Sequence, residues 1–245
     1  MHNKLLELSM NNLADEDGDI LHIPHGDMPG DKINIEKSHI EKAKVIFPEL
    51  IKKVKECATT NSKVVITVCG GSGVGKSEIA SLLAHYFENM GVGCYTLSGD
   101  NYPYRIPVYN DAERLRIFRE SAIRGMITDG EYSFERFNII HQYQLENKDS
   151  EPKNIVKYPW YESYIRNGAM GLQGYLGTEK EINFFEIQNI VKEFKSGAEK
   201  IWLKRMGRED TELWYEEVDF SEKDILIIEW THGNSKNYTG VDIPV

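Results

Sequence analysis

The sequence predicts an α/β fold in which helices cover both faces of a parallel β-sheet, preceded by an N-terminal helical extension. Two apolar segments, Lys63–Cys69 and Asp224–Trp230, have the length and composition of buried strands. Apolar residues recur at helical spacing between and around them, most clearly over 111–124 and 183–194. Strands that alternate with helices are typical of a parallel sheet with helices on its faces.

A glycine-rich loop joins the first of these strands to a helix. Residues 70–77 read Gly-Gly-Ser-Gly-Val-Gly-Lys-Ser, the pattern of a phosphate-binding loop, and helical spacing follows over 78–87. Glycines let successive backbone N–H groups turn inward, and the start of the helix adds its positive dipole end. The strand, loop and helix therefore predict a P-loop NTPase-type sheet. The residues expected to bind the nucleotide are Gly71, Ser72, Gly73, Val74, Gly75, Lys76 and Ser77.

ATP and Mg²⁺ are the ligands that this loop predicts. Lys76 is expected to reach the β- and γ-phosphates, which makes it a candidate catalytic residue, and the Ser77 hydroxyl is expected to bind the metal. Glu229 stands at the carboxyl end of the strand 224–230, where parallel sheets bind their ligands. A buried carboxylate is costly without a cation, so a magnesium role for Glu229 is favoured over a purely structural one.

The acceptor side of the site is predicted from the end of another strand. The segment 93–98 is followed by Gly-Asp-Asn-Tyr-Pro-Tyr-Arg over 99–105. Phosphoryl transfer needs a group that orients or deprotonates the attacking hydroxyl, and the carboxyl edge of the sheet brings Asp100 close to the terminal phosphate. The alternative is that Asp100 only forms a tight turn, which Gly-Asp-Asn also suits. Its position relative to the loop favours catalysis.

Three of these features together resemble the uridine kinase and phosphoribulokinase family of P-loop kinases. They are the loop at 70–77, Asp-Asn-Tyr after the second strand, and Ile-Ile-Glu at the end of the strand 224–230. The resemblance covers about 63–124 and 198–240. It implies that Asp100 acts as a base toward a hydroxyl of a small molecule, and that Tyr102 and Arg105 contact this acceptor.

Further candidates for acceptor contacts come from position alone. Arg205 and Arg208 lie on either side of Gly207 in a predicted loop between strands at 200–204 and 213–218. If this loop faces the crevice, the two guanidinium groups are suited to a carboxylate or phosphate on the acceptor. His232 lies in the loop after Glu229 and is a further candidate for an acceptor contact. A structural hydrogen bond would explain this histidine equally well.

The expected domain organisation is an N-terminal extension at 1–60 and a kinase-like domain at 61–245. The extension carries a helix over about 36–57, in which Pro48 predicts a kink or a break. The domain contains an insert at about 125–197 without a sustained period, in which Gly168–Gly177 is interpreted as a loop. The resemblance also implies an arginine-bearing lid and a last strand, neither of which we find in the sequence. The strand expected to begin at 241–245 would leave an apolar edge, to be covered by the extension, the insert or a second copy in a homodimer.

Composition narrows the function further. The net charge is −10 over 245 residues, which argues against a nucleic-acid partner. Neither a membrane span nor a signal peptide is predicted, so we expect a cytoplasmic protein. The sequence thus predicts an ATP-dependent kinase whose acceptor is a small hydroxylated metabolite such as a nucleoside, sugar, sugar acid or pantothenate-like compound. The alternative is a nucleotide-binding regulatory or assembly protein without transfer activity.

Overall fold

The computed structural model describes residues 4–9, 23 and 25–245. The chain separates into two compact units. The first, called the sheet unit, comprises Met1–Pro103 together with Asn183–Val245, and the second, called the helical unit, comprises Tyr104–Ile182. The expected insert at 125–197 therefore differs from the observed unit at both ends, because the helix at 107–128 packs within the helical unit and the helix at 184–195 within the sheet unit.

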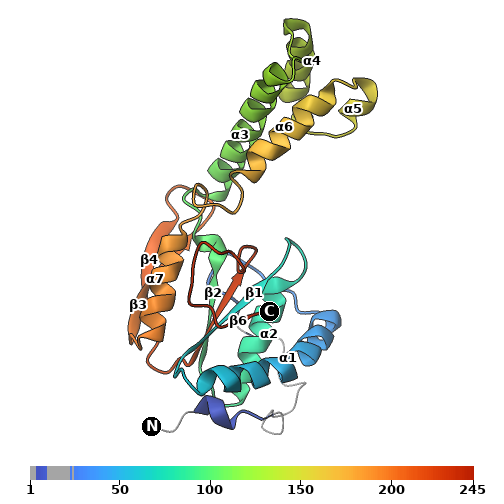
Figure 1. Cartoon of the computed structure of the whole chain (residues 1–245). Coiled ribbons are helices and arrows are strands. Elements are labelled where there is room, and N and C mark those ends of the chain that lie inside the picture. The colour runs from blue at the N-terminus through green and yellow to red at the C-terminus, as the bar shows by residue number, and fades with distance from the viewer. Residues whose placement is uncertain (1–3, 10–22, 24) are drawn as a thin grey trace. The chain divides into compact units, whose positions relative to one another are not determined.

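A parallel sheet forms the centre of the sheet unit, as predicted (Figure 1). Within the described residues its strands follow the order β2-β5-β1-β6. Their bounds are β1 Val64–Cys69, β2 Cys94–Ser98, β5 Ile225–Trp230 and β6 Ile243–Pro244. The register aligns Glu229 of β5 with Val68 of β1 and with Ser98 of β2. Three strands therefore end at the same edge, which is where a ligand crevice of a parallel sheet forms.

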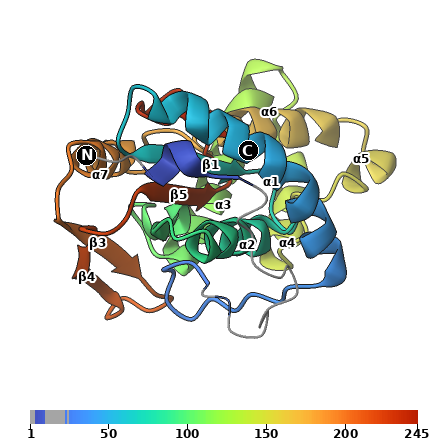
Figure 2. The ribbon, with the colours of Figure 1, turned by 90° about the horizontal axis from the view of Figure 1, so that it is seen from below.

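One face of the sheet is covered by two helices that pack against each other (Figure 2). Their bounds are α1 Lys37–Ala58 and α2 Lys76–Asn89. The Phe47 ring of α1 lies 5.1 Å from that of Tyr86 and 4.9 Å from that of Phe87. α1 continues through Pro48, so the expected break does not occur. Burial of Phe47 and its neighbours compensates for the backbone hydrogen bond that proline removes.

The other face of the sheet contacts α7, Phe184–Lys195. Side chains alternate along a strand, so Trp230 points away from Ile225 and Ile227, which share the core of α1 and α2. The Trp230 ring lies 5.3 Å from that of Phe184 in α7. Helices thus cover both faces of the sheet, as the sequence predicts.

A separate antiparallel hairpin lies beside the end of β2. It consists of β3 Lys200–Met206 and β4 Leu213–Asp219. The Lys204 ammonium donates to the Pro103 carbonyl at 2.9 Å, and the Met206 N–H donates to the Asn101 side-chain oxygen at 3.1 Å. Both predicted strands are confirmed, and these bonds attach them to the segment that follows β2.

The described part of the expected N-terminal extension is built into the sheet unit. A 3-10 turn, η1, covers Lys4–Glu7. Leu5, Leu8 and Ile23 are buried in the core that α1 and α2 share with the sheet. Gly26 passes β2 so closely that an added Cβ would lie 3.6 Å from the Thr96 methyl group. Residues before α1 therefore pack directly against the nucleotide-binding fold.

The helical unit is built around two helices that approach closely. Its helices are α3 Pro107–Thr128, α4 Phe134–Leu145, α5 Asn154–Lys157 and α6 Tyr161–Gln173. A Cβ at Gly168 of α6 would lie 2.6 Å from the Phe118 ring of α3. The sequence predicts that residues 168–173 belong to a loop, but they are helical. Glycine at position 168 allows this helix to pack closely against α3.

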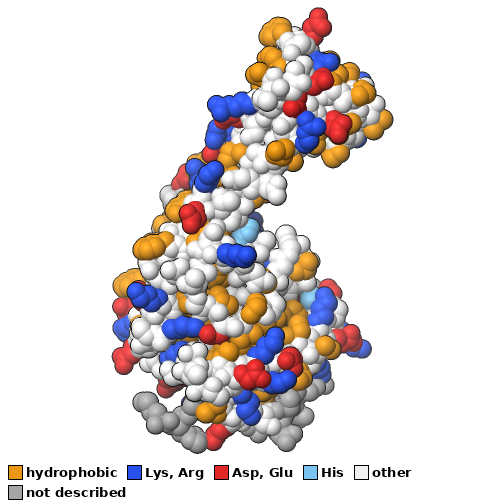
Figure 3. All heavy atoms as spheres, in the orientation of Figure 1, with side chains coloured by type: hydrophobic (Ala, Val, Ile, Leu, Met, Phe, Trp, Pro, Cys, Tyr) orange, Lys and Arg blue, Asp and Glu red, His pale blue; other side chains and the backbone are white. Residues whose placement is uncertain are grey.

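Charged side chains of both signs are interspersed over the face drawn in Figure 3. The chain as a whole carries ten more acidic than basic residues. Across the ranges that the structure describes, no helix combines the length and the apolar character needed to cross a membrane.

Candidate active site

The loop between β1 and α2 has the backbone that its glycines predict. Gly73 and Gly75 have φ angles of 75° and 91°, in the left-handed region that favours glycine. Gly75 precedes the first residue of α2, and its carbonyl accepts the Ile79 N–H at 3.0 Å. A Cβ at Gly75 would also lie 2.9 Å from the His39 ring of α1. Both the backbone conformation and the neighbouring helix therefore require glycine here.

Lys76 lies over this loop and close to the end of β5. Its ammonium donates to the Gly71 carbonyl at 3.0 Å, and it lies 3.9 Å from the Glu229 carboxylate. The two side chains are 10% and 9% exposed, respectively. An ion pair so well shielded from water is stronger than one at the surface. Lys76 and Glu229, two predicted residues of the phosphate side that lie far apart in the sequence, are thus close together in the structure.

The electrostatics of Glu229 identify its other neighbours. The pKa of the Glu229 carboxyl is raised to about 7, mainly by burial and in addition by the negative charges of Asp100 and Asp31. Lys76 and a hydrogen bond with Ser77 act in the opposite direction. The charges of two other carboxylates, Asp100 and Asp31, therefore act on Glu229 at the edge of the sheet where the loop begins.

These groups suit a magnesium ion. The Ser77 hydroxyl and the Glu229 carboxylate are oxygen donors, and Mg²⁺ commonly uses one or two protein oxygens together with substrate phosphates and water. A cation there would relieve the repulsion and the burial cost that raise the pKa of Glu229. Over the described part of the chain, His, Cys, Asp and Glu side chains nowhere gather in threes as a self-contained metal site. The donor set fits a metal that is shared with a nucleotide.

Asp100 lies in a short 3-10 turn, η4 Gly99–Asn101, directly after β2. A Cβ at Gly99 would lie 2.1 Å from the Trp230 ring, so the turn rests on that ring and only glycine fits. The Tyr102 N–H donates to the Gly99 carbonyl at 3.1 Å and closes the turn. The backbone thereby places Asp100 where its charge acts on Glu229.

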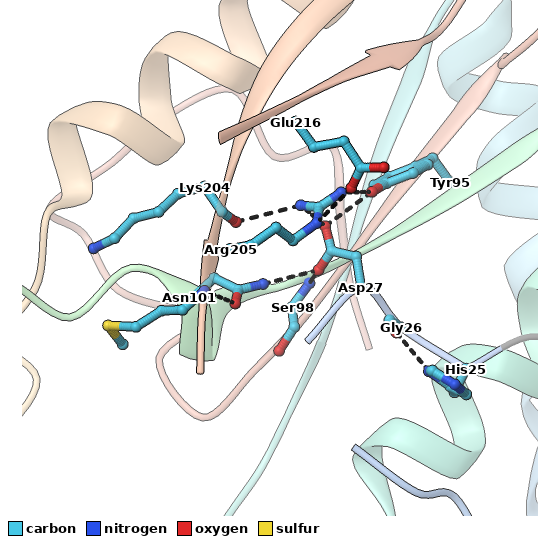
Figure 4. Close-up of polar contacts among 10 residues, drawn as sticks. His25, Gly26, Asp27, Tyr95, Ser98, Asn101, Lys204, Arg205 and Glu216 are labelled. Atoms are coloured by element: carbon cyan, nitrogen blue, oxygen red, sulfur yellow. Dashed lines mark hydrogen bonds and ion pairs between the residues drawn. The ribbon is translucent and has the colours of Figure 1, made fainter. Parts of the chain in front are cut away.

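A residue that the sequence did not indicate binds this turn (Figure 4). One carboxylate oxygen of Asp27 accepts the Ser98 N–H at 2.7 Å and the Asn101 amide at 3.1 Å. The other accepts the Tyr95 hydroxyl and the Arg205 guanidinium, both at 2.9 Å. The Asp27 side chain is only 8% exposed. Burial raises its pKa to about 6, although Arg205 and these hydrogen bonds act to lower it.

Two of the candidates for acceptor contacts lie inside the sheet unit. The Arg205 side chain is 6% exposed, and besides Asp27 it binds the Glu216 carboxylate at 3.1 Å. Tyr102 is buried, and among the described residues its hydroxyl has no hydrogen-bond partner. The structure therefore pairs Arg205 within the protein rather than leaving it open toward a ligand.

The other three candidates for acceptor contacts, Arg208, His232 and Arg105, lie in three different segments of the chain. Arg208 is exposed in the turn between β3 and β4, where its N–H donates to Glu212. His232 packs edge-on against Trp230, with 5.4 Å between ring centroids. Arg105 belongs to the helical unit, where it donates to the Tyr175 hydroxyl at 3.1 Å.

Comparisons with known proteins cover the part of the chain that contains the loop and the turn. A family model described as Zeta toxin matches residues 48–124. The chain has a P-loop NTPase-type fold. Over 198 residues, 80% of this chain, it is 38% identical to the bifunctional alpha-galactosidase/sucrose kinase AgaSK of Mediterraneibacter gnavus, of which the match spans 16%. Together these findings support a domain of the P-loop kinase superfamily, without singling out uridine kinases and phosphoribulokinases.

Proposed function

We propose that this chain is an ATP-dependent kinase that transfers the γ-phosphate to a hydroxyl group of a small metabolite. The observation that carries the proposal is the convergence of Lys76, Ser77, Asp100 and Glu229 at one edge of the sheet. A nucleotide-binding protein needs the first two of these residues. The additional carboxylate in a turn after β2 is what a transfer reaction to a hydroxyl requires.

On the phosphate side, each residue has a distinct role. The backbone of the loop and the start of α2 bind the phosphates, and Lys76 stabilises the negative charge that shifts toward the β–γ bridge. Ser77 and Glu229 would hold Mg²⁺, which would neutralise negative charge on the phosphates of the nucleotide. The Lys76–Glu229 contact keeps the ammonium over the loop.

On the acceptor side, Asp100 orients the hydroxyl and accepts its proton. The hydroxyl oxygen forms a bond to the γ-phosphorus while the bond from that phosphorus to the β–γ bridging oxygen breaks, which yields ADP and a phosphate ester. The proton moves to the Asp100 carboxylate and is then released to water. A base placed in this way contributes roughly 10²–10⁴-fold to such a reaction.

A sugar is the acceptor class that we propose. AgaSK is described as a sucrose kinase, and its identity to this chain extends over most of the sequence. The match covers only 16% of AgaSK, so its name does not assign a substrate to this chain. Sucrose is therefore the first of several acceptors to test. Nucleosides, sugar acids and pantothenate complete the panel.

The test is ADP release from MgATP with each acceptor in turn, followed by mass spectrometry of the product. We expect sucrose or another sugar to stimulate ADP release and to gain one phosphate. A reaction without acceptor measures the background hydrolysis of ATP. Tight ATP binding without stimulation by any acceptor would contradict the proposal and support a regulatory nucleotide-binding protein.

A further inference from the structure

Asp27 binds the residues on either side of Asp100. Ser98 lies two positions before it and Asn101 one position after it, and both donate to the same oxygen of Asp27, at 2.7 and 3.1 Å (Figure 4). The Ser98 N–H points outward from β2, which lies at the edge of the central sheet. Asp27 therefore supplies the acceptor that a neighbouring strand supplies elsewhere in a sheet.

We propose that Asp27 is a positioning residue that holds the turn carrying Asp100 in its working conformation, an inference that rests on the proposed function. The residue acts through the turn rather than on the substrate. It lies before residues 48–124, the segment that the Zeta toxin model matches. The acceptor side of the site is thus completed by a segment that precedes the nucleotide-binding fold in the chain.

The second oxygen of Asp27 connects the turn to the β3–β4 hairpin. This oxygen accepts the Arg205 guanidinium at 2.9 Å, and Arg205 also donates to the Tyr95 hydroxyl at 2.8 Å. Asn101, whose amide binds Asp27, accepts the Met206 N–H of β3 at 3.1 Å. The turn is therefore held by two segments, the one that carries Asp27 and strand β3, and Asp27 binds both the turn and Arg205 of β3.

The hydrogen bonds of Asp27 support more than a structural role for this residue. A purely structural ion pair needs only Asp27 and Arg205, whereas two of the four hydrogen bonds to Asp27 come from Ser98 and Asn101, on either side of Asp100. A displacement of about 1 Å in a reacting group is enough to cost a hundredfold in rate. A carboxylate that fixes both flanks of the base is suited to prevent such a displacement.

The first test is hydrogen–deuterium exchange of the full-length chain, because it requires no acceptor. In Asp27→Ala, peptides covering 97–102 are expected to exchange at least tenfold faster, with β1 and β5 unchanged. Glu216→Gln is the matched control, because Glu216 binds the same guanidinium but not the turn. Unchanged exchange at 97–102 in Asp27→Ala would overturn the proposal.

The second test separates positioning from stability. With MgATP and sucrose, Asp27→Ala is expected to lower kcat at least tenfold while the KM for ATP changes less than threefold. Asp27→Asn keeps an oxygen that can accept the Ser98 N–H, so it is expected to recover most of kcat. Because burial raises the pKa of Asp27 to about 6, the fold is expected to tolerate an uncharged side chain there. Glu216→Gln is expected to behave as wild type.

If Asp27→Ala does not fold, Asn101→Asp makes the same test from the turn. It keeps the acceptor for the Met206 N–H and replaces only the amide that donates to Asp27. A wild-type kcat in a folded Asp27→Ala or Asn101→Asp variant would overturn the proposal. If wild type releases no ADP with any acceptor, the proposed function fails, and the exchange experiment still decides whether Asp27 holds the turn.

Discussion

The phosphate side and the acceptor side of this site are assembled in different ways. The phosphate side is a run of consecutive residues, 70–77, joined by Glu229 from the adjacent strand β5. The acceptor side is a turn whose partners are distant in the sequence. Asp27 lies 71 positions from Ser98 and 178 from Arg205, and both bind it directly.

This difference predicts how variants of each side should affect the proposed reaction. A local loop keeps its shape through its own backbone and the helix that follows. A turn held by long-range contacts depends on the packing of the whole unit. Variants of the phosphate side should therefore change nucleotide binding and transfer together, whereas variants of the acceptor side should change transfer alone.

The largest expected effect is on the phosphate side. Lys76→Met removes the ammonium that lies over the loop, so transfer from MgATP should fall by roughly 10²–10³-fold, the loss typical of one preorganised charge-stabilising group. Affinity for ATP should fall as well, which isothermal titration calorimetry measures. Loss of transfer with unchanged ATP affinity would contradict the proposed placement of Lys76 on the phosphates.

The next largest effect concerns the packing beneath the acceptor turn. In Gly99→Ala the new Cβ would lie 2.1 Å from the Trp230 ring, so we expect the free energy of unfolding to fall by about 3 kcal/mol or more. Gly26→Ala is the control, because its Cβ would make an ordinary contact of 3.6 Å with Thr96. Urea unfolding compares the two variants. Equal stabilities would show that the turn does not rest on Trp230.

A smaller effect is expected from the pH dependence of Asp27. Its pKa is about 6 in the folded chain and 3.8 for an ordinary aspartate. Between these values the folded state binds more protons than the unfolded state, so the free energy of unfolding falls as pH rises. At 1.36 kcal/mol per pKa unit, the change is about 2–3 kcal/mol and is complete near pH 7.

Asp27→Asn lacks this titration. Urea unfolding at pH 4.5 and pH 7.5 should therefore show a larger loss of stability with rising pH in wild type than in the variant, since contributions from other groups cancel in the comparison. A steeper loss in the variant would contradict the raised pKa of Asp27.

The smallest effect is expected at Tyr102. Its buried hydroxyl has no hydrogen-bond partner among the described residues, so Tyr102→Phe should change the free energy of unfolding by less than about 0.5 kcal/mol. The KM for ATP should also stay unchanged. If the hydroxyl contacts the acceptor, as the resemblance to the uridine kinase and phosphoribulokinase family implies, only the KM for the acceptor should rise. A substantial loss of stability would instead reveal a structural hydrogen bond.

The sequence predicts the fold around the phosphate side because the information for that fold is local. The parallel sheet, the loop at 70–77 and the strand that carries Glu229 near its carboxyl end follow from short patterns of apolar residues and glycines. Asp27 carries no such signal, because it lies in an irregular segment near Pro29 and Gly30 and acquires its partners only through folding. The position of Arg205 near Gly207 predicts a contact with the acceptor if that loop faces the crevice, whereas the structure pairs Arg205 with Asp27.

The helical unit shows the same limit. Gly168–Gly177 suggests a loop because glycine has a low helix propensity. In the structure, residues 168–173 are helical, because the missing Cβ of Gly168 lets α6 approach Phe118 of α3. Tertiary packing overrides a local preference there, and a single sequence does not contain the contact that decides it.

The central claim is that Asp100 acts on the acceptor while the loop binds the nucleotide independently. The most direct test is Asp100→Asn, with ATP affinity and acceptor-dependent transfer measured on the same preparation. We expect the Kd for ATP to stay within about twofold of wild type and transfer to fall by about a hundredfold or more, because the base is lost. Transfer at the wild-type rate in Asp100→Asn would contradict this account.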